Sequence, residues 1–111
     1  MALIDEIQRK FSSNEVEFTK HAAIRSFTRH IAVSEIREAI AVGKVIEDYP
    51  DDKYGPSCLV FGRTASNRPL HVQCSHPVRD ILKIITVYEP DPDEWIEFRQ
   101  RKSKDDEEEM E

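Results

Sequence analysis

The spacing of apolar residues changes once along this chain, and that change constrains the fold more than any other feature. Up to Gly43 apolar residues recur at helical spacing, whereas from Lys44 onward they alternate with polar residues. Helical segments followed by alternating segments predict an α+β domain, with helices on one face of an antiparallel sheet. A length of 111 residues fits one small domain.

The first part of the chain predicts three helices, over residues 1–12, 19–30 and 35–42. Thr19 and Ser34 are residue types that cap helix starts, and Gly43 is a natural stop. In the second helix one face carries three basic residues, His21, Arg25 and Arg29, at i, i+4 and i+8. We expect the opposite face, Ala23, Ile24 and Phe27, to be buried.

The second part predicts four strands, over residues 44–49, 57–63, 70–75 and 81–89. Their short links favour antiparallel neighbours, because a parallel crossover needs a dozen or more residues. Trp95, Ile96 and Phe98 predict a closing helix over residues 93–102. The predicted architecture is therefore N-terminal helices packed on a four-stranded antiparallel sheet, with a C-terminal helix.

The net charge of −6 comes largely from the end of the chain, where six of the 22 acidic residues lie in the last seven positions. We expect residues 104–111 to form a disordered acidic tail and residues 1–103 to form the single domain. The domain then holds 15 basic and 16 acidic residues, counted from the same sequence. A nearly neutral domain neither requires nor excludes a polyanionic partner.

The sequence predicts a cytoplasmic protein with no membrane contact. The chain has no apolar stretch of bilayer length, and residues 1–6 lack a basic segment followed by an apolar one. The two cysteines, Cys58 and Cys74, are too few for a disulfide framework and lie in apolar strand patterns, so we expect packed thiols.

The basic face of the second helix has two interpretations. Its three groups repel one another unless an anion lies among them, and arginine forks suit a phosphate. The alternative is an ordinary solvated face with carboxylates nearby.

In the third predicted strand, His71, Gln73 and Ser75 alternate with apolar residues and should lie on the open face of the sheet. The fourth strand offers Thr86 and Tyr88, or Lys83, as polar neighbours of His71.

No metal or cofactor is predicted. His71, Cys74 and His76 are close in sequence, but positions 71 and 74 of a strand point to opposite faces. The chain has no paired cysteine or His-Glu-x-x-His motif, and no glycine-rich phosphate loop.

Several segments together resemble a prokaryotic domain-of-unknown-function family, the one numbered 4258, over about residues 18–99. They are Phe18–Ala22 with Arg25 and Arg29, Ser34–Ile40, Gly43–Tyr49, Cys58–Gly62, Leu70–Val72 and Ile84–Tyr88. That family looks like a relative of RelE-like and BrnT-like toxins of type II toxin–antitoxin modules. The resemblance implies helices followed by a curved antiparallel sheet, RNA cleavage without metal, and a cognate antitoxin as partner.

Metal-free RNA cleavage needs a base for the 2′-hydroxyl, an acid for the leaving oxygen and cations for the phosphorane. We predict His21 and His71 as base and acid in either order, with Tyr88 as a third catalytic group. Phosphate would be held by Arg25, Arg29, Lys83 and Thr86. The alternative functions are a non-catalytic protein-interaction module and a small domain that binds an anionic ligand; the sequence leaves the oligomeric state open.

Overall fold

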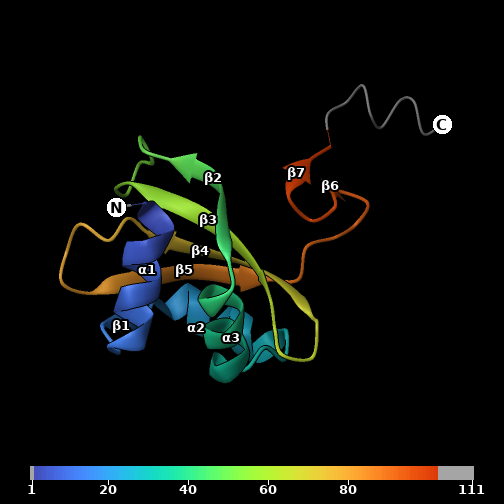
Figure 1. The fold of residues 1–111 in the computed structure, drawn as a ribbon, viewed down its shortest axis with the longest axis horizontal. Helices are drawn as coiled ribbons and strands as arrows, with labels where there is room; N and C mark the ends of the chain where they lie inside the picture. The colour runs from blue at the N-terminus through green and yellow to red at the C-terminus, as the bar shows by residue number, and fades with distance from the viewer. Residues whose placement is uncertain (1, 103–111) are drawn as a thin grey trace.

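The computed structural model describes residues 2–102, in which three helices and one short strand between the first two precede the remaining strands (Figure 1). The helices are α1 (Leu3–Ser12), α2 (Lys20–Thr28) and α3 (Val33–Ala41). The strands are β1 (Val16–Phe18), β2 (Lys44–Tyr49), β3 (Ser57–Arg63), β4 (Pro69–Ser75), β5 (Leu82–Tyr88), β6 (Trp95–Ile96) and β7 (Gln100–Arg101).

The main sheet has five strands in the order β1-β5-β4-β3-β2 and is mixed, so the prediction of a four-stranded antiparallel sheet is wrong. The four predicted strands are present and antiparallel. The fifth, β1, pairs in parallel with β5, with Val16 opposite Leu82. A strand of three residues is too short to show an alternating pattern, which is why the sequence did not reveal it.

The predicted C-terminal helix is also wrong, because residues 95–101 form the β6–β7 hairpin. The loop between the two strands comprises residues 97–99, and in it Glu97 and Phe98 have φ angles of 51° and 62°. The amide of Arg99 donates to the carbonyl of Ile96 at 3.0 Å across these two residues. Left-handed backbone at Glu97 and Phe98 suits a tight hairpin but is incompatible with a helix. Of the residues that predicted the helix, Trp95 packs against His71 of the sheet, whereas Ile96 is exposed.

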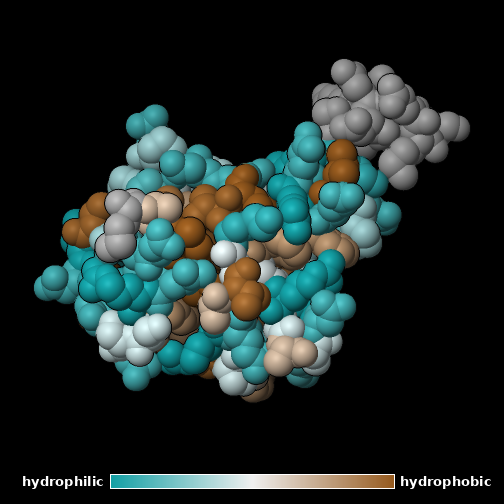
Figure 2. Space-filling view, in the orientation of Figure 1, coloured by the Kyte–Doolittle hydropathy of each residue, from teal (hydrophilic) through white to brown (hydrophobic). Residues whose placement is uncertain are grey.

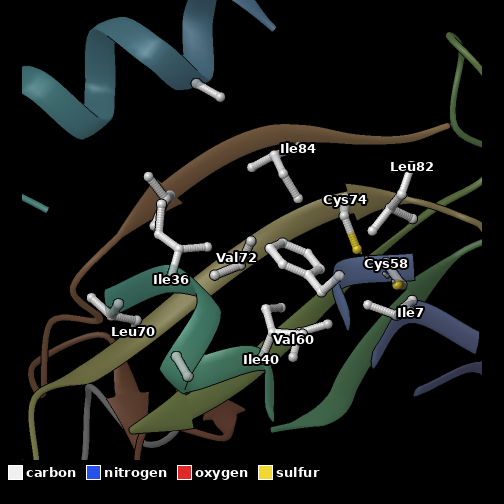
Figure 3. Close-up of a cluster of buried hydrophobic side chains, with 14 of the residues drawn as sticks. Ile7, Ile36, Ile40, Cys58, Val60, Leu70, Val72, Cys74, Leu82 and Ile84 are labelled. Carbon is white, nitrogen blue, oxygen red and sulfur yellow. Dashed lines mark hydrogen bonds between the residues drawn. The ribbon is translucent and has the colours of Figure 1, made fainter. Parts of the chain in front are cut away.

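The core lies between the helices and one face of the sheet (Figure 3). Ile36 and Ile40 of α3 are fully buried against this face. Gly62 of β3 permits that contact, since a Cβ there would lie 1.9 Å from the carbonyl oxygen of Ala39. The strand residues on the core face include Val60, Leu70, Val72 and Ile84.

Cys58 and Cys74 are buried free thiols opposite each other on β3 and β4, as expected. Their sulfur atoms are 3.9 Å apart. The thiol–thiol hydrogen bond and burial raise the pKa of Cys74 well above its usual value, so this thiol stays protonated.

The two internal helices differ from expectation in detail. The cap of α3 is Ala32 rather than Ser34, and the Glu35 carboxylate accepts from the Ala32 amide at 3.0 Å. In α2 the buried residue is Ala22, whereas Ile24 and Phe27 are exposed. The expectation that this apolar side of α2 is buried is therefore wrong.

The surface in the orientation of Figure 2 is largely hydrophilic, with apolar patches near its middle. No helix among residues 2–102 has the length and apolar character needed to cross a bilayer. The predicted acidic tail over residues 104–111 lies outside the described residues.

Candidate functional site

The face of the sheet turned away from the core carries most of the predicted site residues. His71, Gln73 and Ser75 alternate along β4 with Leu70, Val72 and Cys74, which are buried in the core. Tyr88 and Thr86 of β5 lie opposite His71 and Gln73. This outer face has two ends: a covered end at His71 and Tyr88, and an open end at Ser75 and Lys83.

At the covered end the β6–β7 hairpin buries His71 completely. The Trp95 ring meets the imidazole edge-on, with 4.4 Å between ring centroids, and Phe61 lies 5.8 Å away on the same measure. The expectation that His71 faces solvent therefore does not match its position, because a hairpin rather than a helix follows Pro92.

Both ring nitrogens of His71 are engaged. Nε2 lies 2.5 Å from the carbonyl oxygen of Phe98, which can only accept, so Nε2 carries the proton. Nδ1 lies 3.2 Å from the Tyr88 hydroxyl, which donates to it. Burial lowers the pKa of His71, although the Phe98 carbonyl opposes this. The imidazole is thus a neutral, fully bonded part of the interior.

Tyr88 connects His71 to Arg29. The Arg29 guanidinium lies 5.9 Å from the centre of the Tyr88 ring and donates to the carbonyl of Val87 at 2.8 Å. Burial raises the pKa of Tyr88. Both residues border a hollow of about 450 Å³ whose other lining residues are Ile31, Arg68, Glu89, Asp91 and Glu94.

That hollow is poorly suited to a phosphate, because acidic side chains outnumber the cations that line it. Arg68 forms ion pairs with Glu35 and Glu89, at 3.2 Å each. Three carboxylates line the hollow against two guanidinium groups. An added anion would meet this negative charge directly.

The open end has fewer acidic side chains. His21 and Lys83 line one hollow of about 390 Å³, beside Tyr54, which is 89% exposed. The remaining lining residues are Thr19, Asp52, Gly55, Pro56, Ser75 and Ile85. Glu17 lies beside Lys83 in the β1–β5 register without an ion pair. Within residues 2–102 neither the imidazole nor the ammonium group has a hydrogen bond or salt bridge.

Backbone contacts hold these two side chains in place. The Thr19 hydroxyl accepts from the Ala22 amide at 3.1 Å and so caps α2, as predicted. The same hydroxyl donates to the carbonyl of Ile85 at 3.2 Å, which ties the start of α2 to β5. The Lys83 amide donates to the Ser75 hydroxyl at 3.0 Å. His21 and Lys83 therefore project from a common framework.

A second hollow of about 270 Å³ adjoins the first and adds Arg79. The two hollows share five lining residues: Tyr54, Gly55, Pro56, Ser75 and Lys83. His76 also borders the second hollow, but its Nε2 lies 2.6 Å from a carboxylate oxygen of Asp48. Tyr54 and Arg79 are not among the predicted site residues, because both lie in loops where no periodic pattern marks a side chain.

The predicted site residues thus form two groups. His71, Tyr88 and Arg29 are in contact at the covered end, whereas His21 and Lys83 share the open hollow. Neither hollow at the open end includes Arg25 or Thr86. Arg25 is exposed one helical turn after His21, and Thr86 is half-buried opposite Gln73. The structure does not bring His21 and His71 into one hollow.

The described part of the chain contains no cluster of three or more His, Cys, Asp or Glu side chains arranged to hold a metal ion. The open end instead offers imidazole, ammonium, guanidinium and phenol groups. Such a set can bind an anion and transfer protons.

Comparisons with known proteins give one family. Its model, described as Domain of unknown function (DUF4258), matches residues 18–89, which include α2, α3 and β2 to β5. Neither the search of curated proteins nor the search of solved structures found a match. The matched region covers well over half of the chain, and the chain belongs to the DUF4258 family.

Proposed function

We propose that this chain is a metal-independent endoribonuclease of a toxin–antitoxin system, with its reaction site at the open end of the sheet. The relationship to RelE-like toxins, which the sequence resemblance implies, supports the class of reaction. The observation that carries the proposal is the hollow of about 390 Å³ beside exposed Tyr54, where the side chains of His21 and Lys83 have no hydrogen bond or ion pair within residues 2–102.

In this proposal the His21 imidazole takes the proton from a ribose 2′-hydroxyl, whose oxygen then bonds to the adjacent phosphorus. The Lys83 ammonium group offsets the charge of the phosphorane, and Arg25 binds a neighbouring phosphate. The bond from phosphorus to the 5′-oxygen breaks, and the Tyr54 hydroxyl protonates that oxygen. The products are a 2′,3′-cyclic phosphate and a 5′-hydroxyl end.

His71 has no direct role in this reaction. Its nitrogens are occupied by Phe98 and Tyr88, so it cannot exchange a proton with RNA while the hairpin is in place. The acid–base pair predicted from the sequence is therefore replaced by His21 with Tyr54.

The test is cleavage of a fluorescein-labelled single-stranded RNA of mixed sequence in the presence of EDTA. We expect cleavage to cyclic phosphate ends, slowed about 100-fold or more by His21→Ala and strongly by Lys83→Gln. His30→Ala is the matched control, since His30 is an exposed histidine in the turn after α2. Absence of cleavage, loss of cleavage with EDTA, or an equal effect of His30→Ala would contradict the proposal.

A second candidate is an interaction module without catalysis. The complete burial of His71, with both nitrogens bonded, favours it over the original pairing of two histidines. A protein that cleaves no RNA under the conditions above, yet binds a protein partner, would establish this alternative.

A further inference from the structure

The solvent-facing side of α2 exposes two large apolar side chains, and neither the proposed reaction site nor the core accounts for them. Ala22 faces the core and is fully buried. At 100° per residue the opposite side of the helix consists of Lys20, Ala23, Ile24, Phe27 and Thr28. Phe27 is 83% exposed and Ile24 is 49% exposed.

This arrangement is the reverse of an ordinary surface helix, in which the outward side is polar. A single exposed apolar residue needs no explanation, but two large ones one turn apart on the same stripe form a contact surface. We call Ala23, Ile24 and Phe27 the α2 stripe. The stripe lies within the region that matches the family model.

The charges around the α2 stripe indicate what covers it. Residues 19–33 contain no Asp or Glu, although the whole chain carries a net charge of −6. The side chains of Lys20, His21 and Arg25 have no hydrogen bond or ion pair within the described part of the chain. A second copy of this chain would bring like charges together, which disfavours a symmetric dimer through this face.

We propose that the α2 stripe binds an amphipathic helix of another protein, with acidic residues flanking the apolar side of that helix. The apolar residues of the partner would cover Ile24 and Phe27, and its carboxylates would pair with Lys20 and Arg25. Because His21 lies on the same helix, a bound partner would also lie close to the open hollow. This inference concerns binding and stands whether or not the chain cleaves RNA.

The test uses labelled helical peptides as probes and fluorescence anisotropy as the measurement. One peptide has a leucine stripe flanked by glutamates, a second has the same stripe flanked by lysines, and a third is a scramble of the first. We expect the first to bind, with at least tenfold weaker binding to Phe27→Ser and severalfold weaker binding to Lys20→Gln. Val78→Ser, which changes another exposed apolar residue at 75% exposure, is the matched control and should bind normally.

Equal binding of all three peptides, no binding by any, or an unchanged affinity of Phe27→Ser would overturn the proposal. The alternative is that a second copy of this chain covers the α2 stripe, and sedimentation of the protein alone tests it. A dimer that Phe27→Ser abolishes would assign this face to a second copy. Phe27→Ser should retain the thermal unfolding and any RNA cleavage of the wild type, whereas His21→Ala should retain peptide binding. The two proposals can therefore fail separately.

Discussion

Each end of the outer sheet face has a histidine, but the two histidines differ in exposure and in hydrogen bonding. His71 at the covered end has no exposed surface and two bonded nitrogens, whereas His21 at the open end is exposed and unbonded within residues 2–102. The hairpin accounts for the difference, because Trp95 and Phe98 fill the space above His71. The availability of a histidine for chemistry depends here on what covers its strand.

Charge separates the same two ends. The hollow beside Tyr88 is lined by three carboxylates and two arginines, whereas that beside Tyr54 has Lys83 and His21 against Asp52. The nearly neutral net charge predicted for the domain is therefore an average over surfaces of different local charge. The local charge, rather than the net charge, decides where a phosphate can bind.

Removal of the cover with Trp95→Ala should destabilise the protein more than any other change considered below. Trp95 is 3% exposed, and truncation of such a residue costs about 3–5 kcal/mol in the free energy of unfolding. Tyr54→Ala is the matched control, because loss of an aromatic ring at 89% exposure should change that free energy by about 0.5 kcal/mol or less. Urea unfolding followed by circular dichroism measures both. Similar losses in the two variants would mean that the hairpin does not protect the covered end.

A smaller effect is expected in the pH dependence of the free energy of unfolding. Burial lowers the pKa of His71 below 6.5, so the unfolded chain takes up a proton that the folded chain resists. The stability contributed by neutral His71 is complete above pH 6.5 and decreases as the pH falls toward the folded pKa. The carboxyl groups with lowered pKa, Glu15 and Glu35 among them, act in a separate range below pH 4.5.

The measurement is the free energy of unfolding between pH 7 and pH 5. We expect a decline in the wild type and in His21→Gln, and a much flatter profile in His71→Phe. An unchanged slope in His71→Phe would assign the acid sensitivity to another group.

The smallest predicted change in the free energy of unfolding comes from a substitution in the loop of the β6–β7 hairpin. Glu97 has a φ of 51°, which a glycine adopts without the steric penalty that a side chain incurs. Glu97→Gly should therefore raise the free energy of unfolding by up to about 1 kcal/mol. Asp93→Gly, at an exposed position outside the left-handed region, serves as control and should be neutral or slightly destabilising. A loss of stability in Glu97→Gly would show that the Glu97 side chain itself matters.

Part of the core could be predicted from the sequence, because the spacing of apolar residues places Ile36, Ile40 and Val72 inside. The spacing of apolar residues gave wrong predictions where a tertiary contact overrides the local pattern. Trp95, Ile96 and Phe98 fit a helix, but the left-handed loop forms a hairpin that buries Trp95 and leaves Ile96 exposed. Phe27 fits a buried stripe, but no described element covers it.

The candidate site was predictable only in part for a related reason. His21 and Lys83 could be selected as chemistry-bearing residues, but their common hollow depends on β1, which places the start of α2 beside β5. Tyr54 and Arg79 complete the surroundings from loops, where side-chain direction follows from contacts rather than from periodicity.

The pairing of β1 with β5 has a consequence for how the molecule assembles. Val16 finds its partner, Leu82, only after nearly the whole matched region has been synthesised. The N-terminal strand must therefore be among the last pieces to join the sheet during translation, and until then one border of β5 is unprotected. Because Thr19 follows β1 directly, the open hollow is completed in that same late event.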